Sequence, residues 1–329
     1  MKLLQTKGYE VIDEWLRSND RSPFLFQQQT WQAIQEGKSG LVNAPTGSGK
    51  TFSVFIGALI QFINANPSNY QAKKKNGLQL MWITPLRALA KDIGRAMAEV
   101  IAELGMSWAI GIRNGDTDTN ERQRQKRQMP EVLIITPESL QLLLAQKGYP
   151  EVFRTLKIIA VDEWHELLGS KRGVQVELAI SRLVGLAASY NPTNLLPSAS
   201  TSDSYPEESP TQNPKHETRN PKPKTRNPKL KTQNTEPETQ IWGISATIGN
   251  LSQARDVLLA TLPSKGDIIK ADIRKNVEIE SIIPDEIEKY PWAGHLGIKL
   301  AEKVLPILEK SQTTLIFINT RGMSELWYQ

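Results

Sequence analysis

The chain has 329 residues, a net charge of +5 and no cysteine. The length predicts about two domains, and the lack of cysteine excludes disulfides, zinc–cysteine sites and iron–sulfur clusters within the chain. The mild basic excess fits a nucleic-acid partner without establishing one, and the lack of a long apolar run predicts a cytoplasmic protein with no membrane segment.

Apolar strand-like segments alternate with helix-like segments along most of the chain. We expect strands at 41–42, 78–83, 108–112, 132–135, 157–161 and 241–244. We expect helices at 52–63, 86–104, 138–145 and 174–186. Continuous apolar strands between helices are typical of a parallel sheet buried on both faces, so the pattern predicts an α/β fold. In such a fold, ligands bind at the C-terminal ends of the strands.

A glycine-rich loop follows the first of these strands and precedes the first helix. It comprises Ala44, Pro45, Thr46, Gly47, Ser48, Gly49, Lys50 and Thr51. Its glycines allow successive backbone N–H groups to face one anion, while Lys50 can reach the β- and γ-phosphates of a nucleotide and Thr51 can offer its hydroxyl to Mg²⁺. The motif usually begins with glycine, where this chain has Ala44. An ordinary glycine-rich turn is the alternative, and residues further along the chain argue against it.

An acidic pair, Asp162 and Glu163, directly follows the strand expected at 157–161. Beside a phosphate loop, we expect Asp162 to hold Mg²⁺ through its water shell and Glu163 to orient or deprotonate the attacking water. The same residues could instead begin a helix, where acids are common. The phosphate loop upstream favours the catalytic interpretation, in which Lys50, Asp162 and Glu163 carry the chemistry.

Two weaker signals fit the same site. Gln27 precedes the phosphate loop, and its amide can both donate and accept hydrogen bonds at the edge of an adenine, although a lone glutamine carries little weight. Ser245, Ala246 and Thr247 end a later strand. The hydroxyl groups of Ser245 and Thr247 could bond to the acidic pair and sense the nucleotide state, but a capped helix start explains this segment equally well.

The composition changes abruptly at 190–240. This segment is rich in Pro, Asn, Thr, Ser and Lys, and it contains a regularly spaced series of threonines, namely Thr211, Thr218, Thr225, Thr232 and Thr239. Its prolines and its scarcity of large apolar residues exclude a coiled coil and predict a disordered, low-complexity insert. Its basic residues could touch nucleic acid, but a solvated insert is the better explanation.

The remaining segments predict a second domain. We expect one domain over 1–264, which includes the insert, and an incomplete second domain over 265–329. The second domain would contain strands at 277–282 and 314–318 and helices at 298–309 and 323–329.

These motifs occur in an order that resembles superfamily-two helicases with a D-E-x-H acidic motif. The motifs are Ala44–Thr51, Thr84-Pro-Leu-Arg87, Thr136-Pro-Glu138, Asp162-Glu-Trp-His165 and Ser245-Ala-Thr247. More narrowly, the chain is similar to the large helicase-related group, and most of all to the ligase-associated DExH-box DNA helicases. The segments that carry this narrower resemblance are 41–47, Gly115-Asp-Thr117, 169–173, 243–250, Pro291-Trp-Ala-Gly-His295 and 317–322.

The resemblance implies a RecA-like phosphate-loop domain, with helices on both faces of a parallel sheet, and the start of a second RecA-like domain. It places ATP and Mg²⁺ between the two domains and single-stranded nucleic acid across them. It assigns the nucleic-acid path to Pro85, Arg87, Gly115, Thr136, Pro137, Asn319, Thr320 and Arg321. It assigns coupling between the two ligands to His165, Ser245, Ala246 and Thr247. A solvated helix residue is the alternative for Arg87, and the basic run at 122–127 is better explained as a solvated surface.

The resemblance also implies an activity, that of an ATP-dependent DNA helicase or translocase that moves 3′-to-5′ on single-stranded DNA. It suggests a role in DNA repair and a DNA ligase or nuclease as a partner, with RNA or a DNA/RNA hybrid as the alternative substrate. In this family, the arginine fingers lie further along the second domain than Gln329. We therefore expect an N-terminal ATP-binding portion with slow turnover on its own. The alternative is a truncated fragment that binds ATP and nucleic acid with little or no turnover.

Overall fold

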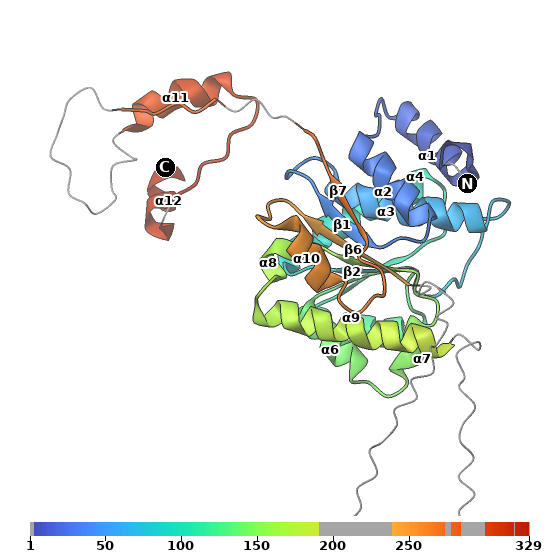
Figure 1. Cartoon of the computed structure of the whole chain (residues 1–329). Coiled ribbons are helices and arrows are strands. Elements are labelled where there is room, and N and C mark those ends of the chain that lie inside the picture. Colours follow the sequence, from blue (N-terminus) through green and yellow to red (C-terminus); the bar gives the residue numbers. More distant parts are fainter. Residues whose placement is uncertain (1–2, 191–238, 274–277, 284–299, 319, 329) are drawn as a thin grey trace, which may run out of the picture. The chain divides into compact units, whose positions relative to one another are not determined.

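The computed structural model describes residues 3–190, 239–273, 278–283, 300–318 and 320–328 (Figure 1). The chain divides into two units, Met1–Ile273 and Arg274–Gln329. The insert that we predicted to be disordered, 190–240, lies outside the described residues except at its two ends. Among the described residues, no helix is both long enough and apolar enough to cross a membrane.

The first unit contains a seven-stranded parallel sheet in the order β3-β4-β2-β5-β6-β1-β7. The strands are β1 (Gly40–Asn43), β2 (Leu80–Ile83), β3 (Ile110–Arg113), β4 (Val132–Ile135), β5 (Ile158–Val161), β6 (Gln240–Ser245) and β7 (Asp267–Lys270). The helices are α1 (Lys7–Ser18), α2 (Leu25–Gln35), α3 (Lys50–Ala65), α4 (Arg87–Glu103), α5 (Thr119–Arg127), α6 (Pro137–Leu144), α7 (Tyr149–Phe153), α8 (Trp164–Leu167), α9 (Lys171–Tyr190) and α10 (Leu251–Leu258). The predicted α/β fold with a parallel sheet is confirmed.

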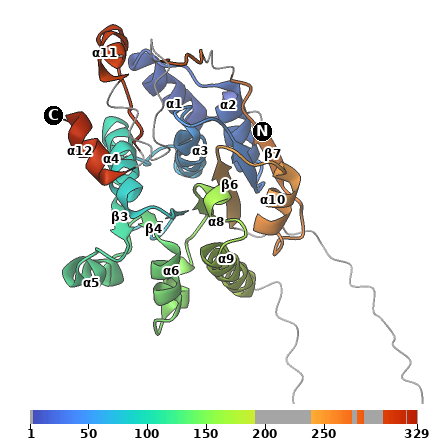
Figure 2. The same cartoon turned by 90° about the vertical axis from the view of Figure 1, so that its left-hand side faces the viewer.

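Helices cover both faces of this sheet, as the apolar strands predicted (Figures 1 and 2). Helices α1 to α4 enclose one core, in which Trp31, Phe55 and Met97 are fully buried. Helices α6 to α10 enclose the other core with residues such as Leu140 and Trp164. Helix α3 is apolar nearly all round because it lies between α1, α2 and the sheet.

A row of alternating large and small residues fixes the register of the central strands. Trp82 lies beside Ala160, Ala160 beside Trp242, and Trp242 beside Gly40. A Cβ atom at Gly40 would come within 2.8 Å of the Trp242 ring, so the row has no room for a larger residue there. Because side chains alternate between the faces of a strand, Asp162 follows Ala160 on the face that carries the Trp82 ring.

The first unit extends past the boundary expected at 264/265. Strand β7 pairs in parallel with β1, with Leu41 opposite Ile268, and the unit therefore runs to Ile273. Sequence reasoning did not anticipate β7, because this edge strand is short and half-buried and lacks a continuous apolar run.

The second unit contains α11 (Ala301–Lys310) and α12 (Arg321–Tyr328), close to the helices expected at 298–309 and 323–329. The expected strands are wrong: residues 278–282 and 314–318 form none, and Val277 lies outside the described residues. A strand requires a partner for its backbone groups, and neither segment pairs with another among the described residues. Their apolar side chains accordingly remain exposed, with Ile279 at 89% and Phe317 at 87%.

Candidate nucleotide-binding site

The glycine-rich loop joins β1 to α3 in the conformation that an anion site requires. Gly47 and Gly49 both have a φ of +78°, a region that favours glycine. The Ser48 hydroxyl donates to the Pro45 carbonyl over 2.6 Å and tightens the turn. Helix α3 begins after Gly49 without a side-chain cap, so its first N–H groups remain available to an anion.

Ala44, at the place where the motif usually has glycine, is 1% exposed. Its N–H donates to the Ser245 carbonyl over 3.0 Å and thereby extends the pairing of β1 with β6. The departure from the usual motif therefore lies at the end of the strand, before the turn that contains Gly47 and Gly49.

Gln27 contacts this loop directly from α2. Its amide nitrogen donates to the Gly49 carbonyl over 3.2 Å, and its amide oxygen accepts from the Phe24 N–H over 2.9 Å. The side chain is buried, and a Cβ atom at Gly49 would lie 2.9 Å from its nitrogen. Gln27 thus lies against the phosphate loop, while its contact with adenine stays a prediction, since both amide groups already have partners within the chain.

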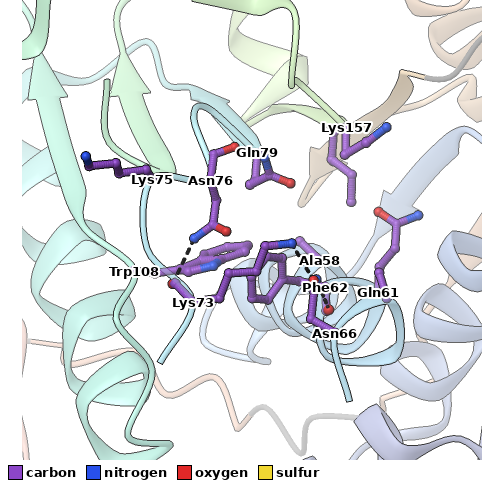
Figure 3. Close-up of a pocket in the computed structure, with 12 residues that line it drawn as sticks. Ala58, Gln61, Phe62, Asn66, Lys73, Lys75, Asn76, Gln79, Trp108 and Lys157 are labelled. Carbon is purple, nitrogen blue, oxygen red and sulfur yellow. Dashed lines mark hydrogen bonds between the residues drawn. The ribbon is translucent and has the colours of Figure 1, made fainter. Parts of the chain in front are cut away.

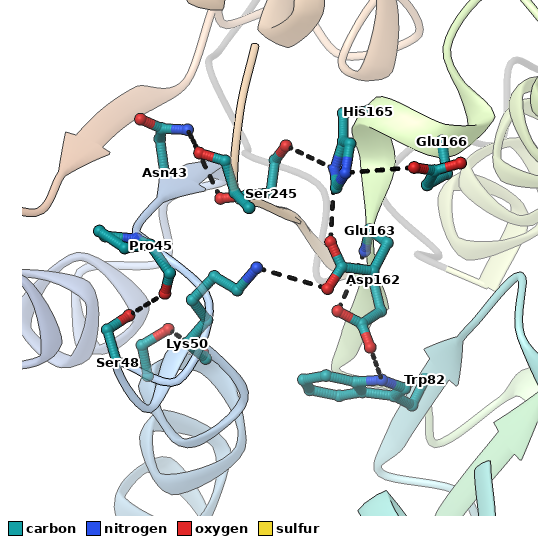
Figure 4. A network of polar contacts seen from close by, with 12 residues as sticks. Asn43, Pro45, Ser48, Lys50, Trp82, Asp162, Glu163, His165, Glu166 and Ser245 are labelled. Carbon is teal, nitrogen blue, oxygen red and sulfur yellow. Dashed lines mark hydrogen bonds and ion pairs between the residues drawn. The ribbon is translucent and has the colours of Figure 1, made fainter. Parts of the chain in front are cut away.

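The acidic pair faces the loop across β6 (Figure 4). Lys50 Nζ lies 3.4 Å from Glu163 Oε1, and the Lys50 side chain is only 8% exposed. Glu163 has a φ of +45°, which is uncommon for a residue with a side chain and is typical of functional sites. The structure therefore brings together the three residues expected to carry the chemistry, from the ends of β1 and β5.

Asp162 is almost fully buried and has two donors. The Glu163 N–H donates to its Oδ1 over 3.0 Å, and the indole N–H of Trp82 donates to its Oδ2 over 3.3 Å. Burial, followed by the charge of Glu163, raises the pKa of Asp162 from 3.8 to about 6. Sequence reasoning missed Trp82, because only the register of β2 beside β5 places it next to Asp162.

A histidine connects the acidic pair to the end of β6. His165 Nδ1 lies 3.1 Å from Ser245 Oγ and 3.3 Å from Glu163 Oε2. Asn43, a polar residue at the end of β1, donates to the Ala246 carbonyl over 2.8 Å and holds this segment in place. Of the predicted coupling residues, His165 contacts Glu163 and Ser245 contacts His165, whereas the Ala246 carbonyl is bonded to Asn43 and Thr247 is exposed. Their coupling role stays a prediction.

The residues suit a magnesium ion held largely by phosphates and water. Asp162 and Glu163 carry two negative charges against the single charge of Lys50, so the site has an excess of carboxylate. Among the described residues, no group of three or more His, Cys, Asp or Glu forms a ready-made metal cage. This donor set is typical of Mg²⁺, which keeps several waters and needs few protein ligands.

The residues predicted to contact nucleic acid fall into three sets. Pro85, Thr136 and Pro137 are buried at the ends of β2 and β4, and the Thr136 hydroxyl donates to Ser139 over 3.2 Å. Arg87 and Gly115 are exposed and adjacent, since a Cβ atom at Gly115 would lie 2.8 Å from the Arg87 guanidinium. The third set belongs to the second unit: Thr320 and Arg321 are exposed, and Asn319 lies outside the described residues.

The chain is similar to several known helicases. The family model of the DEAD/DEAH box helicases matches residues 24–208. The chain is 28% identical over 337 residues to the ATP-dependent helicase Lhr-Core protein 2 of Thermococcus barophilus, covering 96% of this chain and 33% of the relative. It is 34% identical over 184 residues to the Lhr helicase/uracil glycosylase of Escherichia coli, covering 53% of this chain and 12% of the relative.

Two solved structures share the fold. The helicase Lhr of Mycobacterium smegmatis, bound to ssDNA and AMP-PNP, has a TM-score of 0.66 at 24% identity and matches 99% of this chain and 36% of its own. The DUF1998 helicase MrfA has a TM-score of 0.64 at 20% identity and matches 97% of this chain and 39% of its own. These structures support the RecA-like helicase fold. The chain spans about a third of the length of the first curated relatives it matches.

Proposed function

Because the chain belongs to the DEAD/DEAH box helicase family, we propose that it is the ATP-binding portion of a helicase or translocase that moves on single-stranded DNA. The observation that carries this proposal is the pair formed by Lys50 and Glu163. Their side chains meet across β6 at 3.4 Å, in front of a loop whose N–H groups can receive phosphates.

Each residue of the site has a distinct role in this proposal. The Lys50 ammonium would leave Glu163 and bind the terminal phosphates of ATP, which releases the carboxylate to position the attacking water. Asp162 and Thr51 would hold Mg²⁺, which neutralises charge on the phosphates when bound. The left-handed backbone of Glu163 directs its side chain back toward the loop rather than along α8.

The contact between His165 and Ser245 supports the coupling step. His165 Nδ1 is shared between the Ser245 hydroxyl and Glu163, so a movement of Glu163 when Lys50 is released would alter the bond to β6. Ser245 ends β6, which pairs directly with β1 beside the phosphate loop. A change at the nucleotide would therefore reach β6 through two direct contacts, the first from Glu163 to His165 and the second from His165 to Ser245.

Binding of a fluorescent ATP analogue in the presence of Mg²⁺ tests the proposal. Lys50→Ala should weaken binding by at least about tenfold, because it removes the cation that faces the phosphates. Lys91→Ala removes an exposed lysine of α4 and should leave binding unchanged. Equal affinity of the Lys50 variant and the parent chain would exclude this loop as the nucleotide site.

Turnover separates the proposal from its alternative, a protein that binds ATP and nucleic acid with little hydrolysis. Glu163→Gln should retain nucleotide binding but lower any ATPase rate by roughly a hundredfold or more, since the base is lost. Stimulation of that rate by single-stranded DNA rather than RNA would support the DNA substrate. One structural relative is bound to ssDNA and another, Mss116, to ssRNA. The repair role and a ligase or nuclease partner rest on the sequence resemblance alone.

A further inference from the structure

A separate cavity of about 640 Å³ lies at the other end of the strands from the phosphate loop. Helix α3 connects the two places, because it begins at Lys50 beside the phosphate loop and carries Phe62 and Ala65 to the cavity. A helix of this length spans on the order of 20 Å. The cavity is therefore distinct from the nucleotide site, and its size is within the range of small-molecule pockets.

The floor of the cavity is aromatic (Figure 3). The rings of Phe62 and Trp108 pack edge to face, with centroids 4.8 Å apart and an angle of 67°. The ammonium of Lys73 lies 5.7 Å from the centroid of the Phe62 ring and also hydrogen-bonds to the Asn66 side chain. An apolar surface and a cation are thus available to the same ligand.

The walls of the cavity present amide groups in defined orientations. Gln79 Nε2 donates to the Asn76 carbonyl over 2.7 Å, and Gln61 Nε2 donates to Gln240 Oε1 over 3.1 Å. Because the nitrogen of each amide is engaged within the chain, the two amide oxygens are left to accept hydrogen bonds from a ligand.

The charge around the cavity is positive. Among the residues that the structure describes, Lys73, Lys75 and Lys157 line it, and no Asp or Glu does so. In Figure 3, Lys75 and Lys157 extend outward on opposite sides, whereas Lys73 reaches over the floor. The nearby carboxylate of Glu131 is buried. Its Oε2 accepts from the Ala109 N–H over 2.9 Å, and its Oε1 accepts from the side-chain amide of Asn76, which lines the cavity, over 3.2 Å, so both oxygens have donors within the chain.

We propose that this cavity binds a nucleotide unit, an aromatic base that carries a phosphate. The base would contact the Phe62 and Trp108 floor, its N–H groups would donate to the amide oxygens of Gln61 and Gln79, and the phosphate would bind the Lys73 ammonium. A free mononucleotide and the terminal nucleotide of a strand share this chemistry. The proposal does not depend on ATP binding at the phosphate loop.

Calorimetric titration with AMP tests this site in the Lys50→Ala chain, in which the phosphate loop is weakened. AMP should bind, and Ala65→Trp should abolish the signal, because Ala65 is exposed at the rim and a large ring there would fill the opening. Ala98→Trp, an equal change at an exposed position of α4, should have no effect. Binding that is absent, or that Ala65→Trp leaves unchanged, would overturn the proposal.

Lys73→Ala provides a second variant that leaves the helices untouched. It should weaken AMP binding at least about fivefold, since a charged donor to the phosphate is lost, and unchanged AMP affinity would contradict the assigned phosphate position. A 5′-phosphorylated single-stranded oligonucleotide distinguishes the two sources of the ligand. If the oligonucleotide competes with AMP and Ala65→Trp abolishes this competition, the ligand is the end of a strand. If AMP binds but the oligonucleotide does not compete, the ligand is a free nucleotide.

Discussion

The indole N–H of Trp82 donates to Asp162 Oδ2 over 3.3 Å, so β2 holds the carboxylate that β5 presents to the nucleotide site. This bond, together with the Glu163 N–H on Oδ1, fixes the plane of the carboxylate. The carboxylate therefore does not rotate freely, and its remaining lone pairs are directed to a ligand.

Trp82→Phe should therefore weaken Mg²⁺-dependent nucleotide binding by about tenfold, the effect of one hydrogen bond to a charged group. Binding measured in EDTA should change little. Trp242→Phe is a matched control: this ring is also fully buried in the same row of the sheet, and its indole N–H has no hydrogen-bond partner among the described residues. If both variants lost Mg²⁺-dependent affinity equally, packing rather than the hydrogen bond would be responsible.

The buried Asp162 should also make stability depend on pH. Its pKa rises from 3.8 to about 6 on folding, so the folded chain binds this proton more tightly than the unfolded chain. The free energy of unfolding consequently falls as the pH rises between these values, and the ionised group destabilises the fold above them by up to on the order of 3 kcal/mol.

Asp162→Asn removes this titration. Thermal denaturation in EDTA should show that the variant gains stability relative to the parent chain between about pH 5 and about pH 8, since only the parent acquires a buried charge. The new amide nitrogen faces one of the two donors now bound by the carboxylate, which lowers the stability of the variant by a similar amount at every pH and leaves the gain unchanged. Asp92→Asn changes an exposed carboxylate, so its stability relative to the parent should be the same at both pH values. A constant difference between Asp162→Asn and the parent across pH would contradict the raised pKa.

The two glycines of the phosphate loop should respond differently to alanine. Both have a φ of +78°, and the left-handed backbone costs a residue with a side chain about 1–2 kcal/mol. At Gly47 the added Cβ atom meets nothing within 4 Å, whereas at Gly49 it lies 2.9 Å from the amide of Gln27. Gly49→Ala should therefore also displace Gln27 and lower the affinity for adenine nucleotides.

Gly37→Ala controls for backbone strain, because Gly37 has the same φ, an open environment and a position outside the loop. Urea unfolding should show that Gly37→Ala and Gly47→Ala lower the free energy of unfolding by similar amounts and that Gly49→Ala lowers it more. Selectivity for ATP over another nucleoside triphosphate should decrease only in the Gly49 variant. Unchanged selectivity would mean that Gln27 does not recognise the base.

The sequence predicted the elements whose signal is local. Strand β4 was expected at 132–135 and lies there, because four consecutive apolar residues fill a strand buried on both faces. The phosphate loop and the acidic pair were placed correctly for a similar reason, since each directly follows such a strand. The parallel topology then brings the C-terminal ends of these strands to one edge of the sheet.

The errors concern features that depend on distant partners. The bond from Trp82 to Asp162 requires β2 and β5 to be neighbours in a given register, which no local pattern specifies. The strands expected at 277–282 and 314–318 had suitable apolar residues, yet the described part of the second unit offers them no pairing strand. An alternating pattern indicates that a segment can be a strand, and only its neighbours determine whether it becomes one.

Arg87 offers a test of the nucleic-acid path on the first unit. Its guanidinium lies over the exposed Gly115, and its ion pair with Asp116, at 3.4 Å, is mostly solvent-exposed. Such a pair contributes little to stability, so Arg87 can exchange Asp116 for a phosphate at low cost. Arg87→Ala should weaken binding of single-stranded DNA several-fold and reduce the slope of log affinity against log salt by about one phosphate contact.

Arg95→Ala is the matched control for this prediction. Arg95 lies on the same helix, is similarly exposed and has its own acidic neighbour, Asp92, at 3.7 Å. Because both variants remove one positive charge from α4, a general electrostatic effect would weaken DNA binding equally in the two. Fluorescence anisotropy with a labelled oligonucleotide over a range of salt concentrations measures both the affinity and the slope. A reduced slope for Arg87→Ala alone would place a phosphate beside Gly115, whereas equal slopes would remove this position from the nucleic-acid path.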